Sequence, residues 1–184
     1  MSRNDNIDIQ ALAAENIKTL REGEQLLDSI DQEQFVRSTA PVFHSTIGAH
    51  FRHLLEHFVC FFEQHSSGKV LYDSRRRDQS LEESYVCCRA GLQDVIDKLG
   101  GFANSQVNQE ILVQDSGSTG LVSSTTAREL LFLQSHCLHH FAIVGAISRA
   151  VGADPAANFG VAISTREHHD SSDQAKGEVS ACAQ

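Results

Sequence analysis

The chain has few basic residues and no long apolar run, and each absence argues against a class of protein. Lysine and arginine number 15 against 24 acidic residues, so the formal net charge is -9. An acidic surface repels a phosphate backbone, and we therefore expect no nucleic-acid partner. No segment approaches the roughly 20 apolar residues of a membrane-spanning helix. The first ten residues lack the apolar core of a secretion signal. We expect a cytoplasmic protein without a membrane partner.

Cysteines are few and are not arranged as a disulfide framework. Their number is odd and their spacing irregular: Cys60, Cys87, Cys88, Cys137 and Cys182. Cys60 and Cys137 lie in apolar stretches, where a free thiol behaves as a small hydrophobic side chain. This usage is typical of a reducing compartment. The sequence also lacks a phosphate-binding glycine loop and the nucleophile elbow of a serine hydrolase.

Apolar residues recur at helical spacing in four segments, and 184 residues suit one domain. In the fourth segment Thr126 precedes Glu129 by three residues, which predicts a capping box. Before it, two short apolar runs flank a Ser-Gly-Ser turn at 116–118, a pattern typical of a β-hairpin. We predict an all-α fold: a four-helix bundle with a small β-hairpin excursion between helices 3 and 4, spanning residues 1–165. Residues 166–184 are polar, and we expect a disordered tail. The four helices are expected at about 7–29, 44–65, 80–99 and 126–151.

Ten histidines are present, and two of them define a candidate site on the fourth predicted helix. His136 and His140 are one turn apart, so both imidazoles can reach one ion. Their face also carries Phe132, Leu133 and Ile143, which is the expected core side. A buried polar group without a partner costs on the order of 1–3 kcal/mol, and a metal ion would satisfy both rings. The alternative is a pair of core histidines that are hydrogen-bonded without any metal.

A third ligand has to come from another helix. The second predicted helix offers His50, His53 and His57, and the helical periodicity alone favours His57. Three neutral imidazoles would leave a coordination position open, as in a catalytic site. They suit zinc, nickel or iron alike. A zinc protease is not expected, because no glutamate follows His136.

The stretch Ser45–His53, followed far downstream by the HxxxH of His136 and His140, resembles the DinB-like superfamily. The resemblance implies a four-helix bundle with a three-histidine metal site. Matched by position, it assigns the metal to His53, His136 and His140. His57 and His50 stay open as alternatives to His53.

The resemblance also implies a function. The superfamily includes thiol-dependent transferases and isomerases, so the first hypothesis is a metal-dependent transferase that acts on a small thiol or electrophile. A small thiol would then be a further cofactor. The alternative is a non-catalytic, metal-stabilised helical bundle that acts through self-association, as a homodimer, or through a protein partner. Arg75-Arg76-Arg77 could clamp an anionic ligand, with Arg76 or Arg77 near the metal, although such a run is more often a solvated loop.

Overall fold

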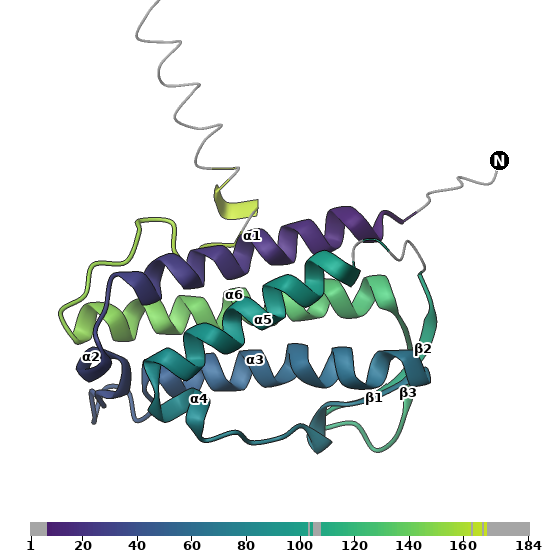
Figure 1. Ribbon diagram of the computed structural model, residues 1–184, viewed down its shortest axis with the longest axis horizontal. Helices are drawn as coiled ribbons and strands as arrows, with labels where there is room; N and C mark the ends of the chain where they lie inside the picture. The colour runs from purple at the N-terminus through teal and green to yellow at the C-terminus, as the bar shows by residue number, and fades with distance from the viewer. Residues whose placement is uncertain (1–6, 103, 105–107, 163, 167, 169–184) are drawn as a thin grey trace, which may run out of the picture.

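The computed structural model describes residues 7–102, 104, 108–162, 164–166 and 168, and it is mostly helical (Figure 1). Four long helices lie side by side. α1 packs against α5 and α6, and α3 packs against the same two helices. Each long helix therefore buries its apolar residues against two neighbours. The long helices are α1 (Ile9–Asp28), α3 (Ile47–Gln64), α5 (Tyr85–Phe102) and α6 (Thr126–Ala150).

Side-chain caps fix where three of these helices begin. The carboxylate of Asp8 accepts a hydrogen bond from the backbone amide of Ala11, and the hydroxyl of Thr46 accepts one from the backbone amide of Ala49. The expectation for α6 was wrong by one residue, because Thr125 is the N-cap and accepts from the amide of Arg128. The predicted capping box is therefore absent, and Thr126 and Glu129 take part in other contacts described below.

The third predicted helix is broken near its start. α4 (Ser80–Glu83) ends at Ser84, whose backbone is extended at φ -121° and ψ 113°, and α5 begins immediately after it. α5 then continues through Gly100 and Gly101, past the expected end of the helix at about residue 99. It reaches Phe102, whose ring packs edge-on against Phe61 of α3. A short helix, α2 (Gln32–Val36), lies in the connection from α1 to α3 and was not predicted.

The predicted hairpin is present as part of a small three-stranded sheet at one end of the helices (Figure 1). β2 (Glu110–Gln114) and β3 (Val122–Thr125) pair antiparallel. The third strand, β1 (Lys69–Leu71), pairs parallel to β2 and was not expected. β1 follows α3 directly, apart from one helical turn at His65–Ser67, so the sheet is tied to the end of α3.

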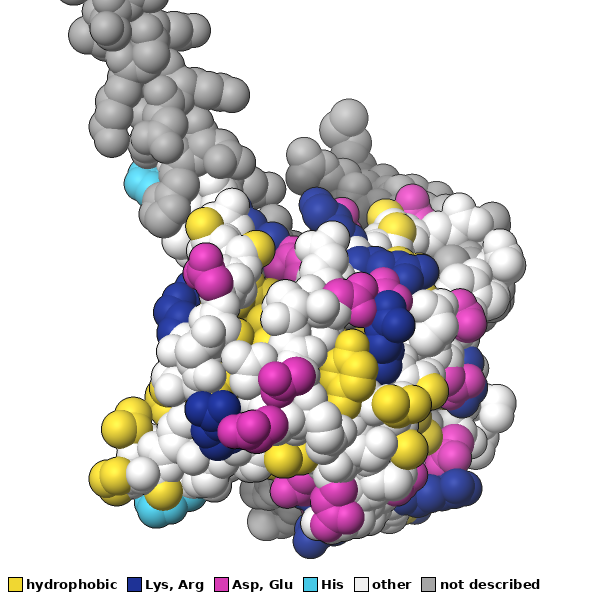
Figure 2. All heavy atoms as spheres, turned by 60° about the vertical axis from the view of Figure 1, so that its left-hand side comes forward, with side chains coloured by type: hydrophobic (Ala, Val, Ile, Leu, Met, Phe, Trp, Pro, Cys, Tyr) yellow, Lys and Arg dark blue, Asp and Glu magenta, His cyan; other side chains and the backbone are white. Residues whose placement is uncertain are grey.

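α6 is long and apolar enough to cross a membrane by length and composition, contrary to the expectation that no segment is. Its contacts are nevertheless those of a core helix in a soluble protein. Glu129 is fully buried on it, and the side-chain amide of Asn16 in α1 donates to the carbonyl of Leu130. Figure 2 shows basic and acidic side chains interspersed on the face that is turned toward the viewer.

The chain beyond α6 returns along the outside of α1. Arg166 donates to both carboxylate oxygens of Glu22, at 2.6 and 2.8 Å, and its Nε donates to the carbonyl of Val161. The predicted disordered tail, apart from residues 166 and 168, lies outside the described residues.

Candidate metal centre

Five histidines meet where α3 packs against α6. His50, His53 and His57 come from α3, and His136 and His140 come from α6. The ring of His57 lies 4.4 Å from that of His136, and the ring of His50 lies 5.1 Å from that of His140, measured between centroids. The two helices are therefore antiparallel. Their rings form a continuous ladder along the interface.

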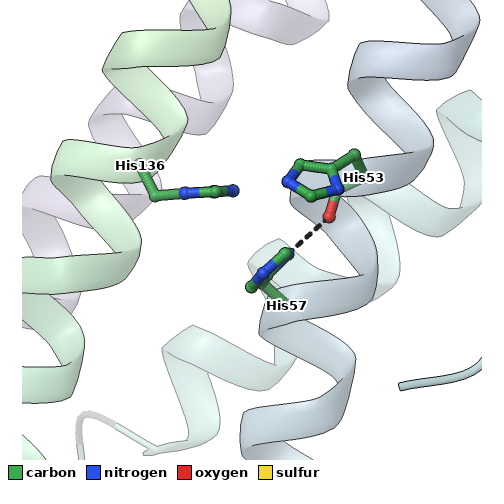
Figure 3. A group of neighbouring side chains, drawn as sticks. All are labelled: His53, His57 and His136. Atoms are coloured by element: carbon green, nitrogen blue, oxygen red, sulfur yellow. Dashed lines mark hydrogen bonds between the residues drawn. The ribbon is translucent and has the colours of Figure 1, made fainter. Parts of the chain in front are cut away.

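Three of the rings bring one nitrogen each into a compact group. The ligand atoms of His53, His57 and His136 all lie within 4.8 Å of one another. Figure 3 shows the rings of His53 and His57 projecting from α3 toward that of His136 on α6. Nitrogens on one tetrahedral ion are about 3.3 Å apart, since each bond is about 2.0–2.1 Å long. Small side-chain adjustments would therefore close this group around a cation.

The positions expected from the family resemblance also lie close together. The ring of His140 is 4.6 Å from that of His53 and 4.6 Å from that of His136. His53 and His136 thus belong to both sets of three. The third member is His57 in the most compact group and His140 in the expected one. The sequence left His57 as an alternative ligand that would replace His53. In the structure both rings belong to the same compact group.

The orientation of His57 is fixed by its own helix. Its Nδ1 lies 2.7 Å from the carbonyl oxygen of His53 (Figure 3). A carbonyl oxygen only accepts, so Nδ1 carries the proton and Nε2 keeps its lone pair. The ring also stacks on Tyr72, with 5.5 Å between centroids and 29° between planes. This arrangement matches that of a metal-ligating histidine whose second nitrogen is held by a backbone carbonyl.

His136 has an unsatisfied nitrogen in this group. Its Nε2 is buried and has no hydrogen-bond partner. Burying a polar atom without a hydrogen-bond partner costs on the order of 1–3 kcal/mol, unless a water molecule or an ion satisfies it. A cation between the rings of His53, His57 and His136 would do so. The donor set therefore fits a divalent ion that prefers imidazole, such as zinc, nickel or iron.

His50 and His140 form a second contact at one end of the ladder. Their Nδ1 atoms are 2.8 Å apart, so one ring donates a hydrogen bond to the other. The Nε2 of His50 is also buried without a partner. His139, in contrast, is exposed, and His65 bonds through Nε2 to the hydroxyl of Thr126 at 2.8 Å.

The site favours neutral imidazoles. Burial, followed by repulsion from His57 and Arg75, lowers the pKa of His53 to about 4. Burial and neighbouring histidines lower the pKa of His136 to about 3 and that of His140 to about 2. Burial also lowers the pKa of His50 and His57. At neutral pH the rings are therefore unprotonated, and a metal ion does not have to displace protons from them.

A buried polar network supports the site from the sheet side. Tyr72 donates its hydroxyl to Glu129 at 2.8 Å, and Glu129 also accepts from Ser124 and Arg128. Tyr72 is 1% exposed and Glu129 is fully buried. Sequence reasoning missed this role of both residues. The sequence pattern predicts a helix cap for Glu129 and no role for Tyr72.

The run Arg75-Arg76-Arg77 places Arg75 near the histidines, and not Arg76 or Arg77 as expected. Arg76 is 79% exposed and pairs with Glu63 at 3.1 Å, as in a solvated loop. Arg77 is also exposed. Arg75 is the least exposed of the three, with a side chain 13% exposed that lies 3.8 Å from the buried carboxylate of Glu56. Arg75 also donates to the carbonyl of Tyr72, the residue whose ring stacks on His57.

Comparisons with protein families, curated proteins and solved structures find no match to this chain.

Proposed function

We propose that the chain is a DinB-like four-helix bundle that binds a divalent metal ion through His53, His136 and a third imidazole. We propose further that it acts as a metal-dependent transferase on a small thiol or electrophile. The observation that supports the metal most directly is the compact group of His53, His57 and His136, with nitrogens within 4.8 Å. The unsatisfied Nε2 of His136 adds an energetic reason for a cation there.

The third ligand is His57 or His140. His57 is favoured by its fixed orientation, because the carbonyl of His53 holds Nδ1 and leaves Nε2 for the metal. His140 is favoured by the family resemblance and by its 4.6 Å ring separation from both His53 and His136. Single variants at His57 and at His140 would distinguish the two, because the loss of metal affinity identifies the third ligand.

The packing supports the bundle part of the proposal. α1 and α3 each contact both α5 and α6, which is the pattern of four helices around a common core. Three buried free thiols, at Cys60, Cys88 and Cys137, agree with a reducing compartment, and we propose a cytoplasmic location.

The chain's own residues suit a reaction on a small molecule. His53, His136 and His140 are each partly exposed, and we propose that a small ligand approaches them from the exposed side. Tyr72 and Phe132 pack against the ring of His57 and shield that side from water. A divalent ion would supply a Lewis acid that lowers the pKa of a bound thiol. Neutral imidazoles would bind that ion without cancelling its charge, and this keeps its effect on a thiol strong.

Metal content is the experiment that tests the proposal. The protein is purified without a histidine tag and its metals are measured by mass spectrometry, beside a His53→Ala, His136→Ala double variant. His44→Ala, which changes an exposed histidine, is the matched control. Metal in the wild type and the control, with almost none in the double variant, supports the site. No metal in the wild type, even after incubation with zinc, nickel or iron, overturns it.

The transferase part needs an activity assay. The metal-loaded protein is incubated with small thiols and electrophiles, and consumption of free thiol is followed. Activity that depends on metal and is lost in the double variant supports transfer. Metal binding without any activity would favour the non-catalytic alternative, in which the ion stabilises the helices.

A further inference from the structure

We infer that Tyr72, anchored by Glu129, is a positioning residue that holds the ring of His57 in place as the third metal ligand. The inference rests on the proposed function and adopts His57, rather than His140, for the ligand position left open there. Neither the sequence pattern nor the resemblance assigns this role to Tyr72 or Glu129. The small sheet then also contributes to the site, because it carries the residues that fix Tyr72.

The ring of His57 needs two constraints to present one nitrogen to a metal ion. The hydrogen bond from its Nδ1 to the carbonyl oxygen of His53, at 2.7 Å, fixes the direction of one nitrogen. A single hydrogen bond still allows the ring to tilt about it, so the plane of the ring requires a second contact. Metal-ligating histidines depend on such neighbouring groups for their orientation.

Tyr72 supplies that second contact. Its ring lies 5.5 Å from that of His57, measured between centroids, with 29° between the planes. The other rings that lie near the imidazole in the described part of the chain, those of His53, Phe132 and His136, are inclined to it by 63°, 62° and 40°. Tyr72 is therefore the ring that most nearly covers a face of the imidazole. A covered face prevents the imidazole from tilting toward that side.

The ring of Tyr72 is itself fixed at both ends. At the far end its hydroxyl donates to the buried carboxylate of Glu129 at 2.8 Å. At the near end its backbone carbonyl accepts from Arg75 at 2.8 Å. The backbone amide of the preceding residue, Leu71, donates to the side chain of Gln64 on α3, also at 2.8 Å. The ring therefore cannot swing away from the imidazole without breaking a hydrogen bond, and close packing around a side chain that is 1% exposed restricts it further.

The small sheet carries this anchor. Tyr72 follows β1 directly, and β1 is held to β2 by the parallel pairing of Val70 with Val113. On the other side of β2, Ser124 of β3 donates its hydroxyl to Glu129. Strands from both sides of β2 therefore fix Tyr72 and the carboxylate that accepts its hydrogen bond. This arrangement connects the sheet to the metal site through one aromatic ring.

The zinc affinity of the untagged full chain tests the inference. The dissociation constant is measured by competition with a chromophoric chelator for the wild type, Tyr72→Leu and Tyr72→Phe. Loss of a group that orients a ligand typically costs 10–100-fold in metal affinity, so we expect about a 100-fold loss without the ring and about a 10-fold loss without the hydroxyl. The matched control is Tyr85→Phe, at the chain's other tyrosine, whose ring packs against Phe35. This control should bind zinc as the wild type does.

A double-variant cycle separates positioning from general destabilisation. His57→Ala should itself bind zinc more weakly than the wild type. If Tyr72 acts through His57, Tyr72→Phe should have little further effect on the affinity of His57→Ala. Val95→Ala, which removes fully buried volume on α5, controls for destabilisation and should leave the zinc affinity unchanged. Circular dichroism verifies that each variant is folded.

Each outcome has a definite meaning. Wild-type affinity in folded Tyr72→Leu overturns the positioning role, wild-type affinity in Tyr72→Phe overturns the anchor at Glu129, and both leave the proposed function intact. Wild-type affinity in His57→Ala assigns the third position to another ring and overturns the inference. An equal loss from Tyr72→Phe with and without His57 also overturns it, because Tyr72 would then act through another group. No zinc bound by the wild type overturns the proposed function, and the inference with it. If Tyr72→Leu does not fold, Tyr72→Phe decides alone.

Discussion

The metal-free protein should lose stability as the pH falls, because the histidine ladder favours neutral rings. Burial lowers the pKa of His136 to about 3 and that of His140 to about 2, from an ordinary value of 6.5. Below pH 6.5 the unfolded chain therefore binds protons that the folded chain does not. The contribution of these two rings to stability is therefore fully present above pH 6.5. It is lost as the pH falls from 6.5 toward the pKa values of the rings in the folded protein.

The magnitude follows from proton linkage. Between pH 7.5 and 5.5 each such histidine changes the free energy of unfolding by about 1.3 kcal/mol. Both rings are partly exposed, so we halve the figure for solvent screening. His136 and His140 together should then account for about 1.3 kcal/mol. Glu56 acts in the opposite direction, because burial raises its pKa and acid pH then stabilises its folded form.

Urea unfolding followed by circular dichroism measures this effect in the presence of a chelator. The wild type is compared with a His136→Asn, His140→Asn double variant at both pH values. Glu56 and every other group contribute to both proteins, so the difference between the two pH dependences isolates the pair. An identical pH dependence in both proteins would refute the reasoning, because it would mean that the two rings titrate alike in the folded and unfolded chains.

Three further predictions concern the metal, a helix contact and the buried network. Zinc at 100 times its Kd should stabilise the wild type by about 2.7 kcal/mol, seen as a Tm rise of about 5–10 °C that a chelator reverses; no rise would contradict metal binding to the folded state. Gly48→Ala should lower the free energy of unfolding in urea by about 1–3 kcal/mol, because the new Cβ would collide with the carbonyl oxygen of Glu82 and the ring of Phe35. Gly101→Ala, where a Cβ meets nothing, is its control, and equal losses would contradict the clash. Tyr72→Phe should cost about 1–3 kcal/mol in the same assay, because fully buried Glu129 loses a donor, and an unchanged midpoint would show that water replaces it.

The helices and the hairpin could be predicted because their signals are local. Apolar residues at helical spacing identify α1, α3 and α6 to within a few residues, apart from a one-residue error at the cap of α6. The pairing of His136 with His140 on one face follows from helix geometry alone, since residues four apart are neighbours.

Contacts between segments that are far apart in the chain decided the remaining features of the fold. The parallel pairing of β1 with β2 joins Val70 to Val113, and no local pattern indicates it. The break at Ser84 and the burial of Glu129 also depend on packing, because the sequence around each is compatible with an ordinary helix.

The candidate site shows the same division. The sequence determined that histidines line the facing sides of two helices, because helical periodicity fixes which residues share a face. It did not determine which rings meet. The antiparallel packing of α3 on α6 sets that register, placing His57 beside His136 and His50 beside His140. A shift of one turn between the helices would change every pair, and only the core packing of both helices fixes it.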